Sequence, residues 1–85
     1  MLDTQLAQYE ATEASLARAT DTRLPLARRR AEAAAGAFAG GAMNASALIA
    51  ARREAIETEL EVIDLEERLA LLGASLTLQF GEQTP

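Results

Sequence analysis

The chain has no cysteine, histidine or tryptophan among its 85 residues, and aromatic residues make up 4% of it. Without cysteine no disulfide can brace the fold, and without cysteine and histidine the usual ligands of structural zinc are missing. The same absences remove the commonest general base and the sulfur nucleophile of enzymes. We therefore expect no enzyme: no catalytic residues, no cofactor and no metal site.

The net charge is −5, and no basic stripe offsets it, which argues against nucleic acid as a partner because its phosphates would be repelled. The one basic run is Arg28–Arg30. Such a run suits either a phosphate or lipid headgroup, or a solvated helix face whose arginines pair with acids. We favour the solvated face, because a hairpin sets this run beside three acidic residues, Glu54, Glu57 and Glu59.

Acidic residues recur at steps of three or four in the second half of the chain: Glu54, Glu57, Glu61 and Asp64. This ladder can be interpreted as ligands for a hard metal ion or as a solvated face. Arg53 lies four residues before Glu57, and Arg68 lies four residues after Asp64, the spacing of ion pairs along a helix. We therefore predict a solvated acidic face.

No run of about 18 apolar residues is present, so we expect no membrane span. The N-terminus lacks the charged and apolar regions of an export signal. Hydrophobic residues make up 49% of the chain, but many are alanine and fill little volume. A short chain with a thin core and no disulfide or metal needs another source of stability. We expect self-association, as a dimer when the chain is isolated.

Small and apolar residues recur at alternating steps of three and four in the second half of the chain. They are Leu48, Ala51, Ala55, Thr58, Val62, Leu65, Leu69, Leu72 and Leu76. This heptad series predicts a helix that packs along another helix. The first half offers a matching series when counted back from the turn: Phe38, Ala34, Ala31, Ala27, Leu24, Thr20, Leu16, Glu13 and Tyr9. We call the two series together the seam.

Opposed seam positions have residue numbers that add to 85 or 86 throughout, as an antiparallel hairpin requires. We therefore predict an all-α fold, an antiparallel two-helix coiled-coil hairpin that associates into a helical bundle. One helix covers about 4–39, capped by Asp3 or Thr4, and the other covers about 45–79, with a turn at 40–44 and a polar tail at 80–85. A short strand over 74–80 is the alternative to continued helix there.

Pro25 interrupts the first helix. Its missing N–H and the clash of its ring with the carbonyl of Asp21 predict a kink. The seam slips at the same place, through an eleven-residue unit that includes Thr20. A true break between Asp21 and Leu24, with Asp21 or Thr22 capping a new helix, is the alternative.

The turn and the first residues after it form the tip of the hairpin: Gly40, Gly41, Ala42, Met43, Asn44, Ala45 and Ser46. Either glycine can take the left-handed conformation that ends a helix, and Asn44 or Ser46 can cap the next. Met43 is an apolar side chain at the tip, either incidental or a contact point for a partner, and both possibilities stay open.

A second apolar stripe runs beside the seam in the second helix, through Ile49, Ile56, Ile63 and Ala70 at a spacing of seven. It widens the apolar face beyond what a two-stranded coiled coil buries. The stripe suits a helix packed in a larger assembly, or the broad core face of a four-helix dimer. We predict that Ile49, Ile56 and Ile63 mediate oligomerisation.

The stretch from Leu24 to Phe80 resembles the C-terminal part of TolC-family outer-membrane efflux proteins, particularly their heavy-metal branch. The matching features are Leu24-Pro25-Leu26-Ala27, Phe38 with Gly41 at the turn, and the Leu48–Glu54 cluster that opens the return helix. In that family, two hairpins per protomer build a trimeric periplasmic tunnel whose tips dock with an adaptor protein. Family members often carry acidic residues where this chain has Ala47 and Ala50.

The resemblance implies that the chain is one periplasmic tunnel hairpin of an outer-membrane transport protein, and that residues 40–46 are its adaptor-docking tip. It also accounts for the second stripe, because a tunnel helix packs against two neighbours. The alternative is a stand-alone helical dimerisation module.

Overall fold

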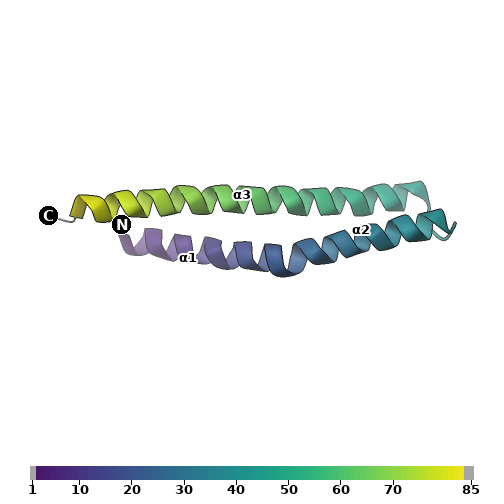
Figure 1. Ribbon diagram of the computed structural model, residues 1–85, viewed down its shortest axis with the longest axis horizontal. Coiled ribbons are helices and arrows are strands. Elements are labelled where there is room, and N and C mark those ends of the chain that lie inside the picture. Colours follow the sequence, from purple (N-terminus) through teal and green to yellow (C-terminus); the bar gives the residue numbers. More distant parts are fainter. Residues whose placement is uncertain (1, 84–85) are drawn as a thin grey trace.

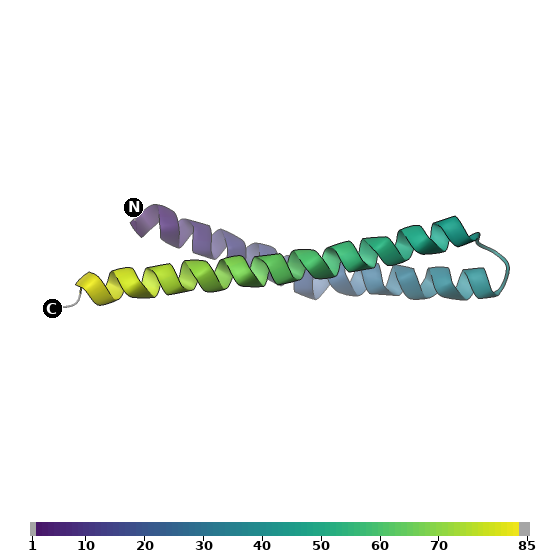
Figure 2. The same ribbon diagram turned by 90° about the horizontal axis from the view of Figure 1, so that it is seen from above.

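The computed structural model describes residues 2–83, which form one long hairpin of 68 × 15 × 15 Å (Figure 1). The first arm consists of α1 (Leu2–Arg18), a π-helical turn η1 (Ala19–Arg23) and α2 (Leu24–Ala39), and α3 (Ala45–Gln83) forms the second. The described residues include no strand. The predicted all-α hairpin is confirmed. Figure 2 shows the two arms crossing near the middle of the molecule.

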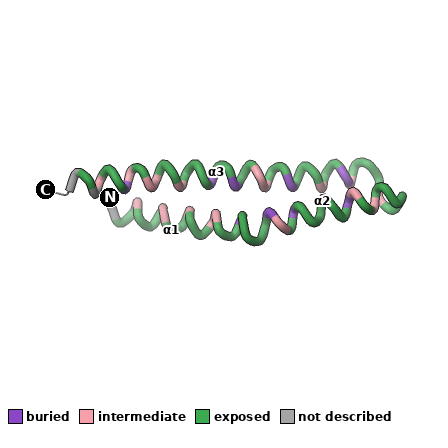
Figure 3. Tube along the Cα trace, in the orientation of Figure 1, coloured by how far each residue is buried: buried purple, intermediate pink, exposed green. Residues whose placement is uncertain are grey.

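The seam of α3 lies where the sequence predicted it. Leu48, Ala55, Val62, Leu65 and Leu76 are buried, and the other four seam positions of α3 are half-buried. In Figure 3 the buried and half-buried residues of both arms lie mainly along the sides that face each other. The core is therefore a single line of contacts between the arms, and no large side chain in the described chain is fully buried.

The alanine-rich half of the first arm also follows the prediction. Leu24, Ala27 and Ala34 are buried, and Ala31 is half-buried. Phe38 is an exception, because its side chain is 44% exposed. It belongs to the last turn of α2, where the chain begins to swing into the connection, and Ala37 is the half-buried residue there. The prediction that Phe38 fills the seam is wrong.

Pro25 is accommodated by widening the helix. The N–H of Leu24 donates to the carbonyl of Ala19, five residues back, which is the bonding pattern of a π-helix. Backbone conformation stays helical from Arg18 to Leu24, and neither Asp21 nor Thr22 begins a new helix. The first arm is thus continuous, and the alternative of a true break does not occur.

The wide turn changes which residues of the first arm face α3. Ala19 is completely buried, and the next buried residue is Leu24, five positions on. Thr20 and Glu13, which the sequence analysis placed in the seam, are exposed, and Thr12 is half-buried in the place of Glu13. The extra residue of the π-turn moves these two seam positions by one residue, whereas Leu16 and Tyr9 are half-buried as predicted. Both seam predictions are therefore corrected.

The turn between the arms is a Schellman motif. The N–H of Ala42 donates to the carbonyl of Ala37 at 2.8 Å, and that of Gly41 to Phe38 at 3.1 Å. Gly41 takes the left-handed conformation, with φ of 79°. Asn44 then caps α3, because its Oδ1 accepts the N–H of Ala47 at 2.9 Å.

The ends of the two arms differ from the prediction. α1 already includes Asp3 and Thr4, so neither residue is the N-cap. α3 continues to Gln83, so the predicted tail is helical over 80–83, and 84–85 lie outside the described residues. A glycine such as Gly81 costs a helix only about 1 kcal/mol, which does not end it. The strand alternative over 74–80 is excluded, since these residues are helical.

Two glycines provide a test of the backbone. Gly36 lies exposed inside α2, and a Cβ there would meet no atom within 4 Å. Gly36→Ala should therefore raise the free energy of unfolding by about 1 kcal/mol, through helix propensity. Gly41→Ala should lower it by a similar amount, about 1 kcal/mol, because alanine is strained at positive φ. Thermal melts at one protein concentration measure both, and equal shifts would contradict the turn described above.

Ala19 and Thr20 test the register of the π-turn, since they are neighbours with opposite exposure. Ala19→Asp should destabilise the hairpin by about 3 kcal/mol or more, because it buries a carboxylate without a partner. Thr20→Asp, at an exposed position, should change stability by less than about 1 kcal/mol. Chemical denaturation measures the difference. If the Thr20 variant were the more damaged, the unshifted register would be correct.

Candidate docking surfaces

The tip lies at the end of the molecule opposite the start of α1 and the end of α3 (Figure 1). Of its seven residues only Met43 is half-buried, and the other six are exposed. The tip therefore presents mainly backbone and small side chains around Gly40 and Gly41. Close approach by another backbone is possible there because these residues carry so little bulk.

The predicted oligomerisation stripe is exposed on the described chain. Ile49, Ile56 and Ile63 are each more than half exposed, up to 58% for Ile63. Three leucines that the sequence analysis missed, Leu60, Leu71 and Leu78, are exposed still further. At about 100° per residue, these side chains centre roughly 160° around α3 from the seam. We call this surface the outer stripe.

The outer stripe gives α3 two apolar sides that point in nearly opposite directions. One side packs on the first arm, and no described part of the chain covers the other. Leu60 lies at steps of four and three between Ile56 and Ile63, whereas Leu71 and Leu78 lie one position beyond that spacing, next to Ala70 and Thr77. The spacing of seven from Ile49 therefore identified only part of the surface.

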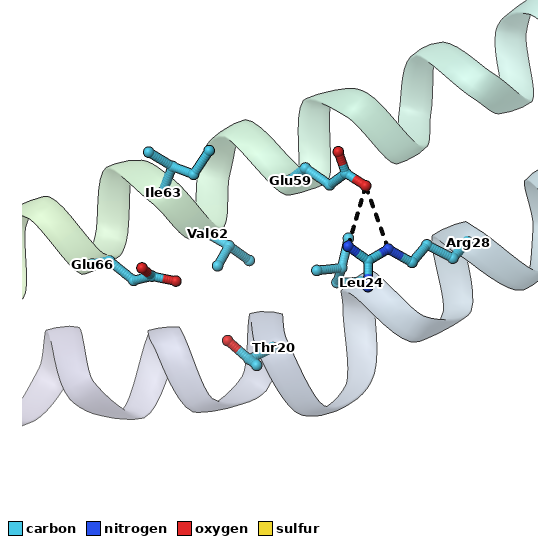
Figure 4. A pocket seen from close by; sticks show the side chains of 7 residues that line it. All are labelled: Thr20, Leu24, Arg28, Glu59, Val62, Ile63 and Glu66. Carbon is cyan, nitrogen blue, oxygen red and sulfur yellow. Dashed lines mark hydrogen bonds and ion pairs between the residues drawn. The ribbon is translucent and has the colours of Figure 1, made fainter.

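A shallow groove of about 340 Å³ flanks the hairpin beside η1 (Figure 4). It is lined by Thr20, Leu24, Arg28, Glu59, Val62, Ile63 and Glu66. The groove joins the outer stripe, because Ile63 belongs to both. Its walls are mainly apolar, and a charged pair, Arg28 with Glu59, closes one end. The groove suits an apolar side chain of a neighbouring helix.

Ion pairs join the arms along the hairpin. Arg23 donates to both oxygens of Glu61 at 2.8 and 3.0 Å, and Arg28 pairs with Glu59 at 3.3 Å. A third cross-arm pair joins Arg30 and Glu54 at 3.2 Å. All these side chains are about half exposed, so each pair contributes at most about 1 kcal/mol. The basic run therefore pairs with acids across the arms, which favours the solvated-face interpretation.

Three residues of the acidic ladder of α3 pair with arginines, and the expected pair of Arg53 with Glu57 is absent from the ion pairs of the described residues. Glu54 and Glu61 pair across the arms, and Asp64 pairs with Arg68 along the helix at 3.1 Å. Over the described residues, no three carboxylates gather closely enough to hold a metal ion. Within the same range, no helix is both long and apolar enough to cross a bilayer.

Comparisons with known proteins found no protein family, no curated protein and no solved structure that matches this chain.

Proposed function

We propose that this hairpin is a non-enzymatic packing element that contributes α3 to a larger array of helices. The observation that carries the proposal is the pair of opposed apolar sides on α3. A helix that served only an isolated hairpin would need a single apolar side. The outer stripe is exposed over six large side chains, and contiguous apolar surface of this kind marks interaction sites.

The specific form of the proposal is a periplasmic tunnel hairpin of an outer-membrane efflux protein of the TolC type, in its heavy-metal branch. The resemblance of Leu24–Ala27, of the aromatic and glycine at the turn, and of Leu48–Glu54 supports it. A hairpin between two neighbours in a trimeric tunnel would use the seam within the chain and the outer stripe between chains. The tip, residues 40–46, would then dock with a periplasmic adaptor protein.

A stand-alone dimerisation module is the second candidate. One observation favours it: two charged residues beside the outer stripe, Arg53 and Glu67, lie seven residues before and seven residues after Leu60, as a surface that pairs with its own copy requires. The reading frame upstream of Met1 separates the candidates. A continuous frame that encodes an export signal and a first hairpin supports the efflux protein, and a stop codon directly upstream supports the module.

Met43 tests the docking role of the tip. Met43→Asp should weaken binding to a cognate periplasmic adaptor at least about tenfold, because it places a charge in an apolar contact. The hairpin should stay folded, since the tip lies beyond the buried part of the seam. Isothermal titration and a thermal melt measure the two effects on the same variant.

Leu65→Asp is the matched control for this experiment. Leu65 is buried against Ala19, Leu24 and Val62, so the variant should lose several kcal/mol of stability, on the order of 3. Any loss of binding by the Leu65→Asp variant would result from unfolding, and a lowered melting temperature would reveal it. If Met43→Asp binds the adaptor as tightly as the parent chain, the tip has no docking role and the efflux proposal fails.

A further inference from the structure

Four members of the outer stripe, Ile49, Ile56, Leu60 and Ile63, belong to a second heptad series on α3. Exposed residues recur at alternating steps of four and three: Ile49, Arg53, Ile56, Leu60, Ile63, Glu67, Ala70 and Ala74. This spacing is the same as that of the seam, and it forms a surface suited to pack against another helix. Only two members of the series are charged.

The two charged members lie symmetrically. Arg53 is seven residues before Leu60, and Glu67 is seven residues after it. Among the ion pairs of the described residues, none involves Arg53 or Glu67. The two residues thus carry opposite charges and lie at the same distance, about 10 Å, from Leu60 at the centre of the stripe.

We propose that the outer stripe binds the outer stripe of a second copy of this chain, with the two α3 helices antiparallel and the two-fold axis near Leu60. In this arrangement Arg53 faces Glu67 of the second copy, and the same pair forms again on the other side of the axis. Ile56 faces Ile63 of the second copy, and Leu60 lies at the centre. The interface is self-complementary, as two-fold symmetry requires.

The charge pattern selects this occupant and this orientation. Two parallel copies in register would set Arg53 against Arg53 and Glu67 against Glu67. A purely apolar helix of another protein would leave both charges without partners and pay for their desolvation. Of these arrangements, the antiparallel pair alone satisfies the two charged positions and buries the isoleucines at the same time.

Charges beside the stripe both support and oppose the pairing. Arg52 faces Glu66 of the second copy, which is attractive, whereas Glu57 faces Asp64, which is repulsive. Asp64 is partly neutralised by Arg68, and Glu59, near the axis, is neutralised by Arg28. Four attractive contacts, two from Arg53 and two from Arg52, thus stand against two weakened repulsive ones. This inference does not rest on the efflux proposal, because it involves neither the tip nor an adaptor.

Charge reversal tests the proposal in the full chain. Sedimentation equilibrium should show a dimer at micromolar concentrations for the parent chain. Arg53→Glu and Glu67→Arg should each raise the dissociation constant about tenfold or more, because each turns two attractive pairs into repulsive ones. An equimolar mixture of the two variants should recover the parent's affinity, as should the double variant.

Two controls accompany the charge variants. Arg29→Glu makes the same charge change at an exposed position of α2 away from the stripe, and should leave dimerisation unchanged. Leu60→Asp should abolish the dimer while circular dichroism still shows a helical chain, because Leu60 is 60% exposed within the chain. A monomeric parent chain, a dimer that survives Leu60→Asp, or charge variants that dimerise like the parent would each overturn the proposal.

Discussion

The covalent ring of Pro25 is the constraint on which the arrangement of the first arm depends. A regular α-helix there would bring the ring against the carbonyl of Asp21 and would leave that carbonyl without its donor. The chain instead adopts the π-turn η1, with the bond from Leu24 to the Ala19 carbonyl. The turn consumes one extra residue. Because of that residue, Ala19 and Leu24 both point inward and join Val62 and Leu65 in one cluster of buried apolar side chains.

Because the core is thin, α3 is more important to the structure than its length alone suggests. Alanine at many seam positions lets the arms approach closely but buries little apolar area per residue. The cross-arm ion pairs are half exposed and add little free energy. A hairpin with so thin a core would gain stability by packing on further helices, and we propose the outer stripe as the surface that packs. Both proposed functions use this surface.

Much of the fold could be predicted because the seam of α3 repeats without interruption, so Leu48 and Leu76 could be assigned to one face. The register of the residues before Pro25 could not be predicted. The same local sequence is compatible with a π-turn and with a kinked α-helix, which differ only in whether Ala19 or Thr20 packs on α3. Leu60, Leu71 and Leu78 were not assigned to the outer stripe because only residues at a spacing of seven from Ile49 were considered. Helix to Gln83 was missed because polar composition alone does not end a helix.

The contact between Tyr9 and Gly73 tests the pairing of α1 with α3 most directly. Tyr9 is the only tyrosine of the chain, and its Cε2 lies 3.4 Å from where a Cβ of Gly73 would stand. A nuclear Overhauser spectrum, filtered to contacts within one chain, should therefore show cross-peaks between the Tyr9 ring protons and the Gly73 α-protons. A spectrum in which the ring contacts other residues of α3 and not Gly73 would contradict the pairing of the two arms described here.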